Sequence, residues 1–407
     1  MIITVVCDIL GEENNGTAVV TMNLIRHLKS EGNTVRILCA DQSKKGLDNY
    51  YVVPNKSFGK ALDKLVSKVG VSLAKVDKSV IAKALDGADH VHIMLPLGLG
   101  LATAKMAHEM NIPLTAGFHM QAENLTSYVG LKKIRPVNTL VYKYIYKHLY
   151  RYCDGIHYPT QFIRNVFESR TKKQTPAYVI SNGVHSYVQK RNVEKPDGLK
   201  DKIVILSIGR YSGEKSQDTL IKAISRSAYK DRIQLILAGQ GLKDKKYKQL
   251  AKDLPIQPIF KLYSRNEIID VLNYCDLYVH PAVDELEGIA CLEGIACGKM
   301  TIVSDSQNSA TKDFAIDGKC IFKHKNSKDL ARVIDYWIEH PIERAEYENK
   351  YLASSAVYRQ EDCMQRMSAM IAEVDNKKRN VKEQELPILL VPQYYSENTD
   401  VFGYNAA

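Results

Sequence analysis

Acidic residues gather among small residues in one short stretch of this chain, PAVDELEGIACLEGIACGKMTIVSD at positions 281–305. The stretch holds Asp284, Glu285, Glu287 and Glu293, although the whole chain carries a net charge of +10. Small residues let a backbone approach a ligand closely, and an ionised carboxylate accepts strong hydrogen bonds from hydroxyl groups such as those of a ribose. These residue types therefore favour a binding site for a hydroxyl-rich ligand.

The residues between these acids predict the start of a helix. Gly288, Ile289 and Ala290 lie between Glu285 and Glu293, and the free N–H groups and positive end of a helix suit a diphosphate. The alternative is that the acids only cap this helix, because acidic side chains also prefer a first helical turn.

Two similar series of strands and helices must position this stretch. In the N-terminal half the predicted elements span 2–10, 17–32, 33–40, 90–96, 99–111 and 112–120. The alternation restarts with elements at 202–210, 216–228, 233–241, 266–275, 276–282 and 300–305. Alternating strands and helices indicate parallel, doubly wound sheets, so the predicted fold class is α/β with two Rossmann-like domains facing a central cleft. Ligands of such sheets bind beyond the carboxyl ends of the strands.

The expected domain organisation follows from these series. The N-terminal domain spans 1–184, a polar linker spans 185–200, and the second domain spans 201–356. A helix at about 357–375 is expected to pack back on the N-terminal domain, and residues 376–407 form a tail.

The composition is that of a soluble globular protein, with 45% hydrophobic and 25% charged residues among 407. No apolar run approaches the roughly 18 residues that a membrane-spanning helix needs, and the first residues, MIITVVCDIL, lack a basic leader. The eight cysteines are scattered without a C-x-x-C pair, which predicts reduced core thiols and neither a disulfide framework nor a zinc site. We therefore expect the protein in the cytoplasm or on a membrane surface that faces it.

The positive charge lies almost entirely in the N-terminal part. Residues 1–180 hold 23 Lys and Arg against 14 Asp and Glu, whereas residues 181–407 hold 33 against 32. Such a one-sided field attracts an anionic partner, which can be nucleic acid, a phosphorylated substrate or an anionic membrane.

The order of these features resembles the retaining GT-B glycosyltransferases of family GT4, over roughly residues 1–375. The signature of that family is Glu, seven residues, Glu, and ELEGIACLE places Glu285 and Glu293 at this spacing, with Gly288 at the usual glycine. The resemblance implies that Glu285 contacts hydroxyls of a donor sugar and that Glu293 accepts from the ribose hydroxyls of its nucleotide. Glu287 lies two residues off register and receives no role.

Further motifs of the same family follow the predicted strands. SIGRYSGEKSQD places Arg210 and Lys215 at the family's Arg and Lys, and two fixed cations can neutralise a leaving diphosphate without a metal. Gly239 in AGQG matches a turn after another strand, a pattern that a simple tight turn also explains. The resemblance implies a UDP-sugar donor and no metal or other cofactor. Solvated surface charge is the alternative for Arg210 and Lys215.

The N-terminal half carries weaker matches. EENNGTAVV resembles the family's glycine-rich loop, with Gly16 matching one glycine and Asn15 replacing the other. GFHMQAEN places His119 at a strand end, where the family carries a histidine near the donor sugar. A neutral imidazole can hydrogen-bond a sugar hydroxyl and stabilise positive charge at the anomeric carbon, whereas a purely structural histidine is the alternative. SNGVH at 181–185 resembles the family's Asn-Gly turn into the linker.

The chemistry implied by the resemblance is transfer with retention of anomeric configuration. The acceptor attacks on the face that the diphosphate leaves, and the leaving phosphate oxygen takes the acceptor proton. A transient nucleophilic role of Glu285 stays open. The sequence shows no serine triad, metal cluster or Walker lysine that would favour another reaction.

Two basic segments predict a membrane-facing surface in the N-terminal half. Their cations alternate with apolar or aromatic residues, as at the interface of an anionic membrane, and comprise Lys60, Lys64, Lys68, Lys132, Lys133, Lys143, Lys147 and Arg151. The alternative is that the tyrosine-containing helix near 142–152 is half core and its cations are merely solvated.

This surface favours a lipid acceptor. ELEGIACLEGIACG with SDSQNSATKDFA resembles the branch of the family that contains diacylglycerol glucosyltransferases and sulfoquinovosyl lipid synthases. The first hypothesis is therefore a transferase that moves glucose from UDP-glucose to diacylglycerol at the inner face of the cell membrane. The second is a transferase that builds a capsule or wall polymer on a lipid-linked or protein acceptor. The third is a nucleic-acid-binding protein, although no nucleic-acid-binding motif accompanies the basic half.

Overall fold

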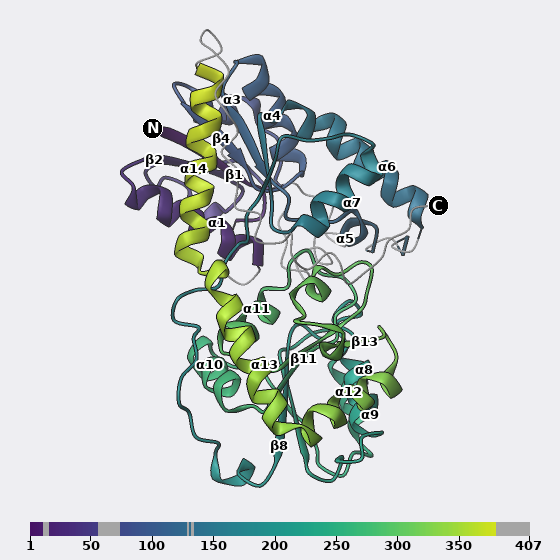
Figure 1. The fold of residues 1–407 in the computed structure, drawn as a ribbon. Helices are drawn as coiled ribbons and strands as arrows, with labels where there is room; N and C mark the ends of the chain where they lie inside the picture. The colour runs from purple at the N-terminus through teal and green to yellow at the C-terminus, as the bar shows by residue number, and fades with distance from the viewer. Residues whose placement is uncertain (11–15, 56–73, 128–129, 132–133, 380–407) are drawn as a thin grey trace.

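The computed structural model describes residues 1–10, 16–55, 74–127, 130–131 and 134–379 as two α/β domains, drawn one above the other in Figure 1. All strand pairs within the two sheets are parallel. Buried apolar runs such as IITVVC and IQLILA form the central strands, because both faces of such a sheet are covered by helices. The predicted fold class, with two Rossmann-like domains, is confirmed.

The N-terminal sheet has seven strands in the order β3-β2-β1-β4-β5-β6-β7. Its strands are β1 (Ile2–Cys7), β2 (Thr34–Cys39), β3 (Tyr50–Val52), β4 (His90–Ile93), β5 (Leu114–Gly117), β6 (Gly155–Tyr158) and β7 (Ala177–Val179). The helices among them are α1 (Gly16–Ser30), α3 (Lys78–Leu85), α4 (Gly98–Glu109), α5 (Ala122–Ser127), α6 (Arg135–His148) and α7 (Gln161–Thr171).

The C-terminal sheet has six strands in the order β10-β9-β8-β11-β12-β13. Its strands are β8 (Ile203–Ile208), β9 (Ile233–Ala238), β10 (Ile259–Lys261), β11 (Leu277–His280), β12 (Thr301–Ser304) and β13 (Ile321–Phe322). Its helices are α8 (Gln217–Ile224), α9 (Asp244–Ala251), α10 (Arg265–Tyr274), α11 (Ile289–Ala296), α12 (Ser327–Glu339) and α13 (Pro341–Ser354).

The strand order reverses at one point in each sheet. In the N-terminal sheet this point lies between β1 and β4, and in the C-terminal sheet it lies between β8 and β11. Loops that leave neighbouring strands in opposite directions separate there and leave room for a ligand. The loops after β8 and β11 carry the acidic stretch and the predicted cations, so the fold brings them to one place.

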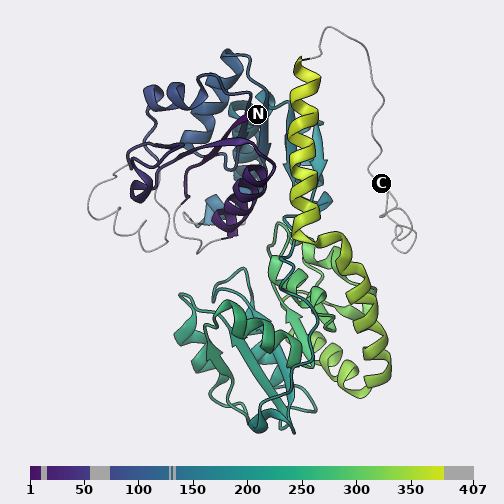
Figure 2. The ribbon, with the colours of Figure 1, turned by 90° about the vertical axis from the view of Figure 1, so that its left-hand side faces the viewer.

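The chain returns to the N-terminal domain at its described end. Helix α14 (Gln360–Arg379) packs on α1, β5 and β6, and Figures 1 and 2 show it lying along that domain. Val184 accepts from Gln360 N at 2.9 Å and donates to Tyr358 O at 2.6 Å, so the two segments that cross between the domains are hydrogen-bonded side by side.

The segment predicted as a polar linker lies against the C-terminal domain. Arg191 N donates to Asn273 Oδ1 at 2.6 Å, and Lys195 is ion-paired with Asp276 at 2.6 Å. These bonds hold residues 185–200 along the ends of α10 and β11.

The cysteines lie in the buried parts of the two domains. All eight cysteines lie in described parts of the chain and are buried as free thiols. Among the described helices, none is both long enough and apolar enough to cross a bilayer.

Candidate functional site

Glu285 is the centre of a polar network beyond the ends of β8 and β11. The Lys215 ammonium, from the loop after β8, contacts Glu285 Oε1. His280, the last residue of β11, reaches the same oxygen through Nε2 at 2.9 Å. Tyr278 Oη lies 3.1 Å from the other ring nitrogen of His280, so the imidazole is held at both ends. The structure thus joins two predicted site residues, Lys215 and Glu285.

The network keeps Glu285 ionised. Burial by itself would raise the pKa of Glu285, but the Lys215 ammonium and the His280 hydrogen bond outweigh it and lower that pKa to about 2. Since a carboxylate only accepts, His280 must donate through Nε2, while its Nδ1 is hydrogen-bonded to the Tyr278 hydroxyl. One Glu285 oxygen is occupied, and no hydrogen bond from a described residue reaches the other.

The start of α11 supplies free donors beside this carboxylate. Gly288 precedes the helix with φ +89°, and a Cβ on it would lie 2.5 Å from Thr311 Cγ2, so only glycine fits. The first turn closes when Cys291 N donates to Gly288 O at 2.8 Å. The N–H groups of Ile289 and Ala290 have no acceptor among the described residues, as expected for the first residues of a helix. Such groups suit a phosphate.

Glu293 lies one turn further along α11. Its carboxylate forms no hydrogen bond with the described part of the chain, and burial raises its pKa to about 7 against the opposing charge of Arg265. A half-buried acceptor without a partner is what a ribose diol would complete.

Arg210 and Gly239 lie near this edge but do not join the network. Arg210 is 68% exposed, with Nη2 4.0 Å from Glu214 Oε1. At Gly239 a Cβ would lie 2.2 Å from Gly209 O, so the neighbouring loop, rather than a ligand, already requires glycine there.

His119 follows β5 in the N-terminal domain. Its ring folds back over Gly117 and lies 5.3 Å from the His157 ring, centroid to centroid. Burial, with a smaller contribution from His157, lowers the pKa of His119 to about 3, so the imidazole is neutral, as predicted for a hydrogen-bonding role. Its Nε2 is buried without a partner among the described residues.

Gly16 begins α1, where a Cβ would meet nothing within 4 Å. Asn15 and the rest of the predicted glycine-rich loop lie outside the described residues.

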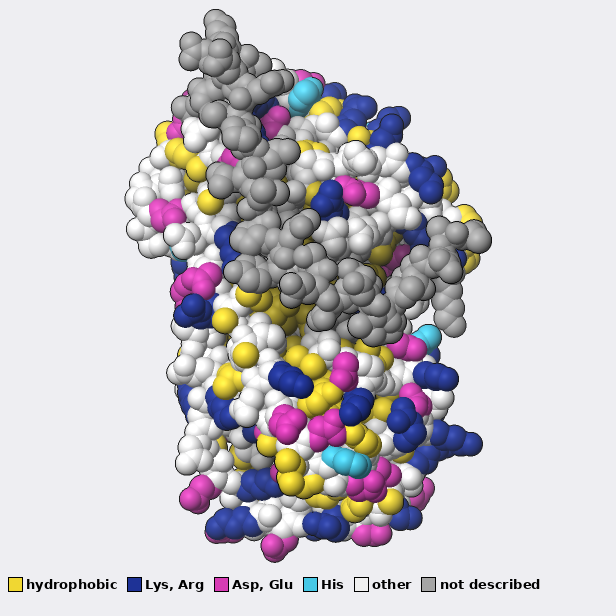
Figure 3. Space-filling view, viewed as in Figure 1, with side chains coloured by type: hydrophobic (Ala, Val, Ile, Leu, Met, Phe, Trp, Pro, Cys, Tyr) yellow, Lys and Arg dark blue, Asp and Glu magenta, His cyan; other side chains and the backbone are white. Residues whose placement is uncertain are grey.

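The predicted membrane-facing residues are only partly described. Lys60, Lys64, Lys68, Lys132 and Lys133 lie outside the described residues. Lys143, Lys147 and Arg151 are exposed on α6 and just beyond its end, beside Leu140, which is 65% exposed, and Tyr144, which is 54% exposed. In Figure 3, Lys and Arg side chains gather at the upper right, where Figure 1 draws α4 and α6. This region is also partly core, as the alternative interpretation expects, because Tyr142 on α6 and Tyr150 just beyond the helix are buried.

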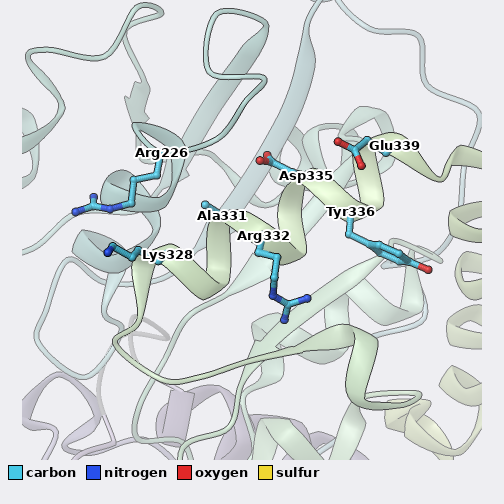
Figure 4. A pocket seen from close by; sticks show the side chains of 7 residues that line it. All are labelled: Arg226, Lys328, Ala331, Arg332, Asp335, Tyr336 and Glu339. Atoms are coloured by element: carbon cyan, nitrogen blue, oxygen red, sulfur yellow. The ribbon is translucent and has the colours of Figure 1, made fainter.

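A separate hollow of about 580 Å³ lies between α12 and the turn that follows α8. Figure 4 shows its lining, which consists of Arg226, Lys328, Ala331, Arg332, Asp335, Tyr336 and Glu339. Asp335 accepts from Ala228 N at 3.0 Å, and Glu339 accepts from the Tyr229 hydroxyl at 3.1 Å. None of the predicted site residues lines this hollow. Within the described residues, no group of three or more His, Cys, Asp or Glu is arranged to hold a metal ion.

The sequence did not predict two residues that take part in the contacts of this site. His280 stands five residues before Glu285 at a strand end, which is a readable signal, but the motif does not include it. Glu287 was set aside as off register, yet its carboxylate accepts hydrogen bonds from Ser181 and Asn182 of the N-terminal domain.

Comparisons with known proteins show the family and the fold of the chain. Residues 188–351 match the model of glycosyl transferases group 1, and residues 14–186 match that of glycosyltransferase family 4. The chain is 24% identical to the alpha-monoglucosyldiacylglycerol synthase of Streptococcus pneumoniae, over 71% of this chain and 67% of that protein. It is 29% identical to the N,N'-diacetylbacillosaminyl-diphospho-undecaprenol alpha-1,3-N-acetylgalactosaminyltransferase of Campylobacter jejuni, over 41% of this chain and 42% of that protein. The crystal structure of Anabaena HepE with UDP has the same fold, with a TM-score of 0.70 and 16% identity over 91% of this chain and 99% of that one.

Proposed function

Because the chain belongs to the GT-B glycosyltransferases of family GT4, we propose that it moves a hexose, glucose in the first instance, from a UDP-sugar to a membrane lipid such as diacylglycerol. The observation that carries the donor half of this proposal is the cluster beyond β8 and β11. There an ionised Glu285, the Lys215 ammonium and the open start of α11 lie together.

Each group of the cluster is proposed to bind one part of the donor. The Glu293 carboxylate accepts from the ribose hydroxyls, and the N–H groups of Ile289 and Ala290 donate to the diphosphate. Arg210 is 68% exposed, and its side chain is proposed to close over the same phosphates. Glu285 presents its second oxygen to hydroxyls of the sugar.

The proposed reaction retains the anomeric configuration. The bond between the anomeric carbon and the phosphate oxygen breaks, the acceptor oxygen bonds to that carbon on the same face, and its proton passes to the departing phosphate oxygen. Arg210, Lys215 and the end of α11 stabilise the negative charge that grows on the diphosphate, so we expect transfer without a divalent metal. A neutral His119 accepts or donates a hydrogen bond on the sugar without adding charge.

The lipid half of the proposal depends on two supports. One is the exposed basic and apolar face of α6, formed by Leu140, Lys143, Tyr144 and Lys147. The other is that two relatives are named for lipid or lipid-linked acceptors. A protein held by such a face would work at the inner surface of the cell membrane, in contact with an anionic lipid surface and without nucleic acid as a partner.

Transfer of labelled glucose from UDP-glucose tests the proposal. The assay uses vesicles of diacylglycerol and anionic lipid with EDTA present, and the Glu293→Ala variant serves as the donor-site control. Label in the organic phase with the wild type but not the variant supports the proposal. If UDP-glucose binds or is slowly hydrolysed without lipid labelling, the acceptor is a lipid-linked sugar, a polymer or a protein. Oligonucleotide binding with steep salt dependence and no turnover would instead favour a nucleic-acid-binding protein.

A further inference from the structure

The loop between β11 and α11 is attached to the other domain by two consecutive residues. Leu286 O accepts from the Thr160 hydroxyl at 2.8 Å, and the Leu286 side chain packs against the N-terminal core. Glu287 follows it and reaches Ser181 and Asn182, just after β7. The same short loop holds Glu285 on one side and the start of α11 on the other, so the donor-site residues lie directly beside an interdomain contact.

Glu287 forms the polar part of this contact. Its Oε1 accepts from the Ser181 hydroxyl and from Asn182 N at 3.1 Å, and its Oε2 accepts from Asn182 Nδ2 at 2.6 Å. The side chain is only 3% exposed, and no cation of the described residues pairs with it. Burying a carboxylate without a cation costs free energy, even when three neutral donors bind it. Those three hydrogen bonds fix the orientation of the Glu287 side chain.

The partner on the N-terminal side is itself fixed. Gly183 follows Asn182 with φ +80°, and a Cβ on it would lie 2.5 Å from Gln360 Cα, at the first residue of α14. Val184 then pairs with the segment that enters α14. Ser181 and Asn182 therefore move with the N-terminal domain and not with the donor loop.

From these contacts we propose that Glu287 is a positioning residue that ties the donor loop to the N-terminal domain. This inference rests on the proposed function, since it concerns how a donor held by Glu285 and α11 is presented to groups of the other domain such as His119. Loss of the tie leaves Ile289, Ala290 and Glu293 in place, because these nucleotide-binding groups belong to α11 of the C-terminal domain. It lets the two halves of the site separate, which lowers the rate of transfer.

Amide hydrogen exchange in the ligand-free protein tests the tie directly, because the Asn182 N–H is one of its bonds. In Glu287→Ala we expect exchange at Asn182 to be faster by about tenfold or more, the effect of losing one to two hydrogen bonds. Amides within β8 should be unchanged, and Glu346→Ala, at an exposed glutamate of α13, should match the wild type. Unchanged exchange at Asn182 would overturn the tie.

A kinetic measurement separates positioning from a general loss of structure. In Glu287→Ala we expect kcat to fall by about tenfold or more while the Kd for UDP changes by less than about threefold. Glu287→Gln keeps an acceptor for Asn182 and should recover part of the rate. A fall in kcat that only follows a fall in UDP affinity, or faster exchange with unchanged kcat, would overturn the positioning role. If Glu287→Ala does not fold, Asn182→Ala removes one bond from the other side.

The exchange measurement also distinguishes this inference from the proposed function, because it needs neither donor nor acceptor. Protection of the Asn182 amide should also depend on pH. Burial, opposed by the bonds from Ser181 and Asn182, raises the pKa of Glu287 to about 7. Among the described residues the Cys363 thiol also faces it, and this thiol stays neutral because burial raises its pKa to about 12. The tied state therefore holds a proton more tightly than the free loop, and protection at Asn182 should decrease as pH rises through 7, but not in Glu287→Gln.

Discussion

His280 donates through Nε2 to Oε1 of Glu285 across 2.9 Å, on the oxygen that Lys215 also contacts. Its other ring nitrogen is hydrogen-bonded to the hydroxyl of Tyr278, two residues earlier on the same strand. The rigid end of β11 thus orients a carboxylate that lies in a loop. The second oxygen of Glu285 is left for a ligand, and Lys215 can turn to a diphosphate while His280 still holds the carboxylate.

Replacing His280 should therefore loosen Glu285 without removing the nucleotide site. We expect His280→Ala to lower kcat by roughly 10- to 100-fold, because a misplaced polar group costs transition-state stabilisation. The Kd for UDP, measured by calorimetry, should change little. His280→Gln retains a donor and should recover part of the rate. Equal loss of kcat in both variants would contradict an orienting hydrogen bond.

Loss of the predicted cations should affect turnover more than donor binding. Lys215→Ala should lower kcat by roughly 100-fold or more, since charge on the diphosphate grows as the bond breaks. It also leaves the Glu285 carboxylate buried without its cation, so the melting temperature should fall. Arg210→Ala should lower kcat with no change in melting temperature, because Arg210 is exposed. Steady-state kinetics and thermal unfolding of both variants check this contrast.

Donor affinity should depend on pH through Glu293. Burial raises the pKa of this carboxyl to about 7, and the ionised form is the better acceptor for a ribose diol. Affinity should therefore be lost as pH falls below 7, with UDP-glucose binding about tenfold tighter at pH 8 than at pH 6. Glu293→Gln should bind weakly and without this pH dependence. An identical pH profile in the variant would place the titrating group elsewhere.

The fold was predictable where strands are long and buried. The apolar runs of β1, β2, β8 and β9 are six residues each, and all were predicted. The short strands β7 and β13, of three and two residues, were not, because so few residues carry no readable period. Their place is fixed by pairing with a neighbouring strand rather than by their own pattern.

The site was predictable only where its partners follow from spacing. Glu285 and Glu293 are separated by one fixed interval, and Lys215 follows the end of a strand. The sequence therefore predicted these three residues in one site. Glu287 could not be interpreted this way, because its partners lie 105 and 106 residues away in another domain. The contact depends on how the two domains pack, which no local pattern encodes.

The exposed face of α6 should hold the protein on anionic lipid. Replacing Lys143, Lys147 and Arg151 with Ser should weaken binding to anionic vesicles by roughly 100-fold, at about 1 kcal/mol per cation. Turnover on a soluble acceptor should be unchanged. A matched control replaces Arg226, Lys328 and Arg332, which line the hollow of Figure 4 in the other domain. Equal losses in the two triple variants, measured by vesicle sedimentation, would show general charge attraction and no specific face.

Gly288→Ala should disrupt the start of α11 for two separable reasons. The backbone there has φ +89°, which strains any other residue, and the new methyl group would lie 2.5 Å from Thr311 Cγ2. We expect a loss of about 1–3 kcal/mol in the free energy of unfolding from the strain, plus the cost of the clash. UDP affinity should fall with it, because the N–H groups of Ile289 and Ala290 shift.

The double variant Gly288→Ala with Thr311→Ser separates the two contributions. Serine lacks the methyl group that the new Cβ would meet, so the clash is relieved while the backbone strain persists. Denaturant unfolding of both variants and of Thr311→Ser alone gives the coupling free energy between the two positions. A coupling near zero would mean that strain alone requires glycine at this position. A large favourable coupling would mean that the close packing of Thr311 on the helix start also requires it.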